Sequence, residues 1–439
     1  MTAAASAQTQ PPLNIRLEGP PQCGFGNVLQ KVNVPYSTLI AAYRDDASAA
    51  GNHTAAKGTG QVYDIPVVFH IVYNAGQASF NLPDSVIRDQ VKALNDAFRK
   101  RNADTVNIRS VFKPLAGDAE IQFHLASVDP QGNPTTGITR TVSSRSYFGT
   151  ATGDLDSLER IKKTAEGGKD PWPSTRYLNI WVANLSTSTG GLNILGYAIP
   201  PLNPLPPNWP AGADQELAGL IDGVVLQTHS VGTNNTLNAA LQGIYTKGRC
   251  GVHEVGHYLG LQHIFSSDGT CNPLSGDGIS DTPEQSTMAG HTMTGCPSST
   301  LNTCGVGTPG DLPDMWENYM DYARDACQTM FTNGQITIMR NVMANQRNSL
   351  ISTTSVGNIP SQKTFGIYPN PAANNLSLLY DGKISRVTIF NFMGQQAMVA
   401  EGATANNRSF DISHLPAGNY MLTAEIAGER ITRKFTVTK

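Results

Sequence analysis

The fold and the chemistry of this chain depend on one stretch, His253-Glu254-Val255-Gly256-His257-Tyr258-Leu259-Gly260-Leu261-Gln262-His263. His253 and His257 are four residues apart, so on a helix both imidazoles lie on one face and can bind one metal ion. Gly260 can adopt the left-handed conformation that ends a helix, and the turn brings His263 to the same ion. Three imidazoles with one open position indicate a catalytic zinc site, because structural zinc sites are closed by four protein ligands.

Glu254 follows the first histidine of this zinc helix. We expect its carboxylate to act on the attacking water as a general base and not to bind the metal. The alternative is a set of ordinary histidines on a packed helix face. The chain has only nine histidines in 439 residues, and three of them fall at the required spacing with the glutamate and the glycine in place, which argues against that alternative.

Length and composition define the class of protein. A chain of 439 residues has room for two or three domains with a large core. The net charge of −3 and the absence of a Lys/Arg cluster argue against nucleic-acid binding. No apolar run reaches the roughly 18 residues that span a bilayer, so no membrane span is expected. With 15% charged residues, 42 glycines and 27 prolines, the composition suits a loop-rich secreted enzyme.

The six cysteines support an oxidising compartment. Four of them, Cys271, Cys296, Cys304 and Cys327, follow the zinc helix on segments rich in Gly, Ser, Thr and Pro. Such segments are stabilised by disulfides in secreted proteins. No Cys-x-x-Cys pair occurs, so a second, structural zinc is not expected.

Residues 1–57 are interpreted as a pro-segment. Residues 1–7 contain a small-residue pattern, Ala5-Ser6-Ala7, that is typical of a signal-peptide remnant, although a plain disordered terminus would look the same. Cys23 is the chemical feature of this segment. A thiolate is a good zinc ligand, so Cys23 can close the open coordination position and keep an enzyme latent. The alternative is a disulfide between Cys23 and Cys250, which lies one helical turn before His253.

Residues 58–350 are expected to form an α/β domain. Apolar and alternating runs predict strands at 65–73, 121–125, 177–182 and 223–226, with an edge strand at 196–200 that ends at a proline. A helix is predicted from 83 to 98, capped by Asn81. A last helix begins at the capping box Thr332–Gln335.

Two further segments complete the chain. Asp277–Glu284 concentrates oxygen donors, and Asp277, Asp281, Thr282 and Glu284 are candidate calcium ligands. The alternative is an acidic loop in solvent. Residues 351–363 are predicted to be a linker, and residues 364–439 have short strands and turns at a spacing typical of a small β-sandwich.

The histidine motif resembles that of metzincin metalloproteases, and Asn318–Tyr322 supplies a candidate Met-turn. Within the metzincins, His253–Phe265, Asp277–Pro283 and Asn318–Cys327 resemble the pappalysins, and among these the ulilysin-like enzymes. The resemblance implies a mixed twisted sheet, a zinc helix, a Met-turn and an irregular lower half.

The resemblance also implies roles for individual residues. Met320 would form the floor under the zinc, and Tyr322 would assist at the developing oxyanion, unless it is only a buried structural tyrosine. Asp325 would select Arg or Lys after the cleaved bond, unless it is neutralised internally, for example by Arg324. Cys23 would be the latency cysteine, and Asp277–Glu284 would hold calcium. The implied disulfides are Cys271–Cys304 and Cys296–Cys327.

The tail resembles the C-terminal sorting domain of the type IX secretion system of Bacteroidetes, through Tyr368–Pro371, Asn391–Gln395 and Leu415–Tyr420. This implies export and contact with the secretion machinery; a passive β-sandwich or a carbohydrate-binding module is the alternative. Together the sequence predicts a secreted, monomeric zinc endopeptidase, made as a zymogen, that acts on proteins or peptides. A narrow regulatory protease and a non-catalytic adhesin with a degenerate protease domain are the competing hypotheses.

Overall fold

The structure is a computed structural model, which describes residues 15–32, 61–150, 154–201, 220–241, 243–266, 269–271, 276–288, 295–305, 307, 310–354, 366–379, 384–391, 395–401, 409–426 and 429–439. The chain divides into two compact units, Met1–Thr354 and Ser355–Lys439. The predicted signal remnant at 1–7 lies outside the described residues. The linker was predicted to begin at residue 351, and this boundary is wrong because helix α8 spans Asn348–Thr354.

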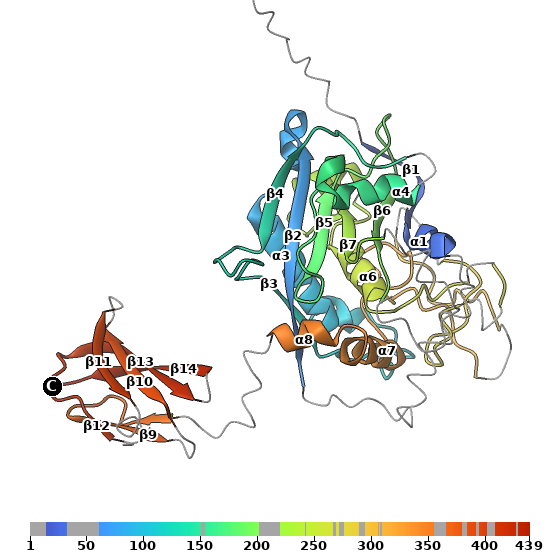
Figure 1. Cartoon of the computed structure of the whole chain (residues 1–439). Helices are drawn as coiled ribbons and strands as arrows, with labels where there is room; N and C mark the ends of the chain where they lie inside the picture. The colour runs from blue at the N-terminus through green and yellow to red at the C-terminus, as the bar shows by residue number, and fades with distance from the viewer. Residues whose placement is uncertain are drawn as a thin grey trace, which may run out of the picture. The chain divides into compact units, whose positions relative to one another are not determined.

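The first unit is built on a mixed seven-stranded sheet (Figure 1). Its strands are β1 (Arg16–Cys23), β2 (Tyr63–Asn74), β3 (Ile121–Leu125), β4 (Ile138–Ser143), β5 (Leu178–Ala183), β6 (Gly191–Ala198) and β7 (Val224–Gln227). They follow the order β1-β6-β7-β5-β2-β3, and β4 also pairs with β2. All pairs are parallel except β6 with β7. The predicted mixed α/β sheet is therefore confirmed.

The edge of the sheet differs from the prediction. The predicted edge strand at 196–200 is β6, which begins five residues earlier, at Gly191, and is covered by β1. Strand β1 belongs to the pro-segment, for which no strand was predicted, and it leads into helix α1 (Phe25–Val32). The pro-segment therefore adds a strand to the sheet instead of lying loosely across it.

Two helices on the sheet position the site. Helix α3 (Asp84–Phe98) buries Ile87, Leu94 and Phe98 in the core, as an amphipathic helix should. It packs on β3 and on α6 (Arg249–Tyr258), the zinc helix. The predicted cap of α3 is wrong, because the N-cap residue is Pro83 and makes no side-chain hydrogen bond.

Shorter elements and loops complete the unit. Helix α7 (Asn333–Ala344) begins at the predicted capping box of Thr332 and Gln335. Helix α4 spans Leu155–Leu158, and 3-10 helices span Ala75–Phe80, Ala103–Asn107, Glu159–Lys162, Thr164–Glu166, Thr228–Ser230 and Thr236–Leu241. Between residues 259 and 332 the described residues form turns, loops and isolated bridges only. This is the irregular lower half that the resemblance implied.

The second unit has its own hydrophobic core, which includes Leu376, Ile389, Leu422 and Phe435. Its strands are β8 (Gly366–Tyr368), β9 (Asn375–Leu379), β10 (Arg386–Asn391), β11 (Gln396–Glu401), β12 (Ser409–Asp411), β13 (Gly418–Ile426) and β14 (Glu429–Val437). They form one sheet of order β11-β10-β13-β14 and one of order β12-β9-β8. Two antiparallel sheets around one core fit the predicted β-sandwich. No helix in the described parts of either unit is long and apolar enough to cross a membrane.

Candidate active site and metal centre

The three histidines of the motif converge on one point. Helix α6 presents His253 and His257, and Gly260, at φ +91°, ends it so that the chain turns back to His263. Their Nε2 atoms lie 3.0, 3.1 and 3.3 Å from one another. Nitrogen ligands on a tetrahedral zinc ion would be roughly 3.3 Å apart, given Zn–N bonds near 2.05 Å. The donor set and its geometry therefore fit a zinc ion.

Backbone carbonyls orient two of these rings. Nδ1 of His253 lies 2.7 Å from the Tyr319 carbonyl oxygen, and Nδ1 of His257 lies 2.8 Å from that of Leu261. A carbonyl only accepts, so each Nδ1 carries the proton and each Nε2 keeps its lone pair for a metal. Burial lowers the pKa of His253 to about 4, which also favours the neutral ligand form.

Cys23 of the pro-segment lies in the same cluster. Its Sγ and one nitrogen from each histidine all lie within 4.8 Å of one another, and this is the only such group of three or more His, Cys, Asp or Glu side chains among the described residues. Cys23 and Cys250 are both free thiols, so the alternative disulfide between them is not formed in this structure.

Glu254 contacts the thiol of Cys23. The Cys23 Sγ donates to Glu254 Oε2 at 3.2 Å, and burial raises the pKa of the Glu254 carboxyl to about 8. Strand β6 passes close by at Gly196, where a Cβ atom would lie 2.8 Å from Glu254 Cγ. The carboxylate is thus confined between α6, β6 and the pro-segment.

Phe25 is a site residue that sequence reasoning missed. Its ring stacks on His257 at 3.9 Å between centroids and 10° between planes, and the residue is fully buried. The Gly24 N–H donates to the Gly196 carbonyl at 2.8 Å, so the turn after β1 is fastened to β6. The sequence feature that could have revealed this residue is the presence of an aromatic side chain two positions after Cys23.

The Met-turn lies against the zinc helix. Met320 is fully buried, and its Sδ would be 2.5 Å from a Cβ atom at Gly256, so only glycine lets it approach this closely. The Met320 N–H donates to Asn318 Oδ1 at 2.9 Å. The Tyr322 ring lies 4.8 Å from that of His263, and its hydroxyl accepts from the Cys23 N–H at 2.9 Å. The structure therefore brings both residues of the expected turn to the histidine cluster.

Asp325 is buried at the wall of a cavity of about 40 Å³ that Cys23, Glu254 and Tyr322 also line. Its Oδ2 accepts from the backbone N–H groups of Lys247 at 2.7 Å and Arg249 at 3.3 Å. Burial raises the pKa of the Asp325 carboxyl. Both donors are backbone N–H groups. The guanidinium of Arg324, which was the alternative partner that would neutralise Asp325 internally, donates to the Gly243 carbonyl at 3.0 Å.

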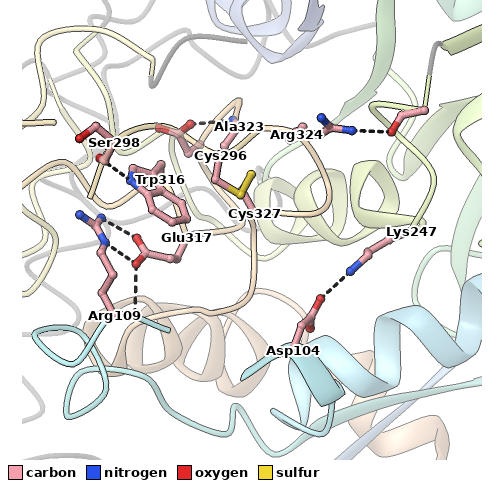
Figure 2. Close-up of a disulfide and its surroundings, with 12 residues drawn as sticks. Asp104, Arg109, Lys247, Cys296, Ser298, Trp316, Glu317, Ala323, Arg324 and Cys327 are labelled. Carbon is pink, nitrogen blue, oxygen red and sulfur yellow. Dashed lines mark hydrogen bonds and ion pairs between the residues drawn. A yellow bond between two sulfur atoms is a disulfide. The ribbon is translucent and has the colours of Figure 1, made fainter. Parts of the chain in front are cut away.

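Two disulfides stabilise the irregular lower half. The structure joins Cys271 to Cys304 and Cys296 to Cys327, the pairs that the resemblance implied. Figure 2 shows the second bond, with the Trp316 indole donating to the Ser298 carbonyl at 3.2 Å. Next to it the Glu317 carboxylate, fully buried, accepts from Arg109 Nε at 2.6 Å.

The acidic loop shows no converging set of ligands among its described residues. Asp277 Oδ1 accepts from the Thr282 hydroxyl at 2.6 Å, and Asp281 accepts from the Thr332 hydroxyl at 2.7 Å and the Gly334 N–H at 2.8 Å. Glu284 is exposed. The calcium site therefore stays a prediction.

Comparison with known proteins agrees with this geometry. Residues 227–344 match the family described as pregnancy-associated plasma protein-A, and residues 366–438 match the secretion system C-terminal sorting domain. An extracellular metalloprotease of Trichophyton verrucosum (strain HKI 0517) is 29% identical over 265 residues, which are 60% of this chain and 72% of that protein.

Two solved structures from Tannerella forsythia are also similar. Mature mirolysin in complex with a cleaved peptide is 36% identical, with a TM-score of 0.56 over 68% of this chain and 98% of that chain. A mutant of promirolysin is 32% identical, with a TM-score of 0.60 over 78% of this chain and 98% of that one. The match to the pro-form covers more of this chain than the match to the mature form. Family, relatives and geometry agree, and the chain belongs to the pappalysin family of secreted zinc metalloendopeptidases, with a C-terminal sorting domain of the type IX secretion system.

Proposed function

We propose that this chain is a latent endopeptidase in which Glu254 is the general base and Cys23 the residue that blocks it. The observation that carries the proposal is the contact of Cys23 Sγ with Glu254 at 3.2 Å inside the histidine cluster. When bound, zinc would polarise the scissile carbonyl and activate a water. Glu254 would accept the proton of the attacking water and pass it to the leaving amine.

Latency follows from where the pro-segment lies. Cys23 Sγ lies within 4.8 Å of one nitrogen of each of the three motif histidines, so it could fill the fourth coordination position of a bound zinc ion. Strand β1 pairs with β6, so it occupies the edge where a substrate backbone could add as a strand. Removal of residues 1–57 would free both the coordination position and the edge. The Tyr322 hydroxyl, which the Cys23 N–H now holds, could then donate to the developing oxyanion.

Asp325 supports a preference for Arg or Lys after the cleaved bond. A partly desolvated carboxylate pairs strongly with a guanidinium. In the latent state its cavity of about 40 Å³ is too small for such a side chain, but Cys23 and Tyr322 form part of the wall. Removal of Cys23 with the pro-segment would enlarge the cavity into a pocket that reaches Asp325.

The acidic loop is proposed to bind calcium through Asp277, Asp281, Thr282 and Glu284. All four residues line a cavity of about 700 Å³ in the lower half of the unit. Calcium takes oxygen ligands in flexible geometry, so a loop can close on the ion.

The test compares the zinc-loaded full chain with three variants in a casein-cleavage assay. Cys23→Ala should cleave at least about tenfold faster than the parent, because latency is lost. Added to the Cys23→Ala protein, which is no longer latent, Glu254→Ala should lower the rate by about 10²–10⁴-fold, the usual contribution of a general base. Cys250→Ala is the matched control, since its thiol is outside the metal-ligand group, and it should stay latent.

Two results would contradict the proposal. A Cys23→Ala protein no faster than Cys250→Ala would remove the thiol from the latency mechanism. A Glu254→Ala protein with full, chelator-resistant activity would favour the hypothesis of a degenerate protease domain with a contaminating enzyme.

A further inference from the structure

The glutamine of the α7 capping box makes a second set of contacts with the segment of the Met-turn. Asn318 Nδ2 donates to Gln335 Oε1 at 2.8 Å, and Gln335 Nε2 donates to Asn318 Oδ1 at 3.1 Å. Both side chains are fully buried. Helix capping does not require this amide pair, because the capping contact of Gln335 is the one that its Oε1 accepts from the Thr332 N–H at 3.0 Å.

Two backbone donors determine which way the amide pair is oriented. A backbone N–H can only donate, so each of the two must face an amide oxygen. The Thr332 N–H faces Gln335 Oε1 at 3.0 Å, and the Met320 N–H faces Asn318 Oδ1 at 2.9 Å. With both oxygens placed in this way, each NH₂ group of the pair lies opposite an oxygen of the other side chain. A flip of either amide would set two donors or two acceptors against each other, so this buried network has one satisfied arrangement.

The amide pair holds the peptide group that orients a zinc ligand. The Tyr319 carbonyl and the Met320 N–H belong to one planar peptide unit and point in opposite directions. The N–H of this unit donates to Asn318 Oδ1 at 2.9 Å, and its carbonyl accepts from His253 Nδ1 at 2.7 Å. Because the unit is rigid, a rotation that turns the N–H away from Asn318 also turns the carbonyl away from His253. The Asn318 amide therefore aims the carbonyl at the histidine.

We propose that Gln335 is a positioning residue for the zinc site. By holding the Asn318 amide it fixes the plane of the peptide unit after Tyr319, and this keeps the proton on His253 Nδ1 and leaves Nε2 free to bind zinc. A group that contacts a metal-bound histidine directly contributes about 10–100-fold to metal affinity. Gln335 acts two hydrogen bonds further away, so its contribution is smaller. The proposal rests on the zinc site of the three histidines and is independent of the proposed roles of Cys23 and Glu254.

The experiment measures the zinc dissociation constant of the full chain by competition with a chromophoric chelator, on a Glu254→Ala background that prevents self-cleavage. Gln335→Met has a similar side-chain volume but can make none of the hydrogen bonds to Asn318 and Thr332. We expect it to bind zinc at least about fivefold more weakly than the parent. The Tm of each metal-free protein is recorded as well, so that zinc affinities are compared only between folded chains.

Ile336→Val is the matched control, because it loosens the same turn of α7 without removing a hydrogen bond of the amide pair. Ile336 is buried in the core of the first unit, so the loss of one methylene should lower the Tm of the metal-free chain. Its zinc affinity should equal that of the parent. A loss of zinc affinity as large as that of Gln335→Met would mean that any weakening of α7 has this effect, and it would overturn the proposal.

Gln335→Glu tests the donor of Gln335 through pH. The introduced carboxyl keeps an oxygen for the Thr332 N–H, and it can donate to Asn318 Oδ1 when it is protonated but not when it is ionised. The zinc affinity of this variant, divided by that of the parent at the same pH, should be near one in acid and fall as the pH rises. A ratio that does not change with pH, or parental affinity in Gln335→Met, would overturn the positioning role alone. A parent chain that binds no zinc would overturn the zinc site together with it.

Discussion

At the scale of single residues, two glycines determine how tightly the site is assembled. At Gly256 an added Cβ would meet Met320 Sδ at 2.5 Å, and at Gly196 it would meet Glu254 Cγ at 2.8 Å. The Met-turn and β6 therefore touch the zinc helix from two directions because neither glycine carries a side chain. Gly256 lies between the two helix histidines, where the sequence motif itself gives no reason for a glycine. The structure gives the reason, which is the close approach of Met320.

Asp325 carries the residue-scale prediction. Asp325→Asn keeps the shape and an oxygen that can accept from the backbone N–H groups of Lys247 and Arg249, but it removes the negative charge. We expect kcat/KM for peptides with Arg or Lys after the scissile bond to fall by about 10- to 100-fold, since a hydrogen bond to a charged group contributes about 1.5–3 kcal/mol. Cleavage of peptides with a neutral residue there should change little.

Arg324→Gln is the control for this prediction. Arg324 is adjacent in sequence and donates to the Gly243 carbonyl, so its loss should leave the basic preference intact. The measurement is the digestion of a peptide library by the activated enzyme, with sequencing of the fragments. If Asp325→Asn still prefers basic residues to the parental extent, the selectivity comes from another acid.

The sequence predicted the convergence of the three histidines, but it did not predict the contacts that surround them. His253, His257 and His263 are close in the chain, so their geometry follows from helix periodicity and one turn. The contacts of Phe25 with His257 and of Lys247 with Asp325 join segments more than 70 residues apart. No local pattern encodes such pairs, because they depend on how the sheet and the loops fold together.

At the scale of elements, the lower half depends on a buried ion pair next to the Met-turn. Arg109 donates to Glu317 through Nε at 2.6 Å and Nη2 at 2.7 Å, and its guanidinium carbon lies 4.8 Å from the ring centroid of Phe112 and 4.5 Å from that of Trp316. Arg109→Met should lower the free energy of unfolding by about 3–5 kcal/mol, because Glu317 would be left buried without its partner.

Urea unfolding of both proteins with zinc present measures this loss. Arg88→Met is the control, since its pair with Asp84 is 3.8 Å long and its side chain is 61% exposed, and such a pair contributes at most about 1 kcal/mol. Equal losses in the two variants would mean that the buried pair adds no specific stability.

Strand β1 shows why some elements escaped prediction. Its sequence, Arg-Leu-Glu-Gly-Pro-Pro-Gln-Cys, has no alternation of apolar and polar residues and contains two prolines, which argue against a strand. It becomes one because β6 offers an unpaired edge, and the register shifts twice along the pair. By contrast, β2 is a continuous apolar run and α3 has a clear helical period, and both were located to within two residues.

At the scale of the whole molecule, the chain divides after Thr354 into two units with separate hydrophobic cores. The matched sorting domain begins at residue 366. All four atoms of the metal-ligand group belong to the first unit. The stabilisation that a metal provides should therefore be confined to that unit.

Removal of the metal tests this directly by hydrogen exchange measured on peptides of the full chain. A metal that binds only the folded state stabilises it by mass action. After chelation we expect amides of α6 and β6 to exchange at least about tenfold faster, and those of β1 as well, because Cys23 loses its anchor. Amides of β10 and β13 in the second unit should change less than about twofold.

Adding zinc alone should restore slow exchange in α6, β6 and β1. Adding calcium alone should protect only residues 277–284 if that loop is a calcium site. Faster exchange in β10 on chelation would contradict the prediction, because it would show that the stability of the second unit also depends on metal.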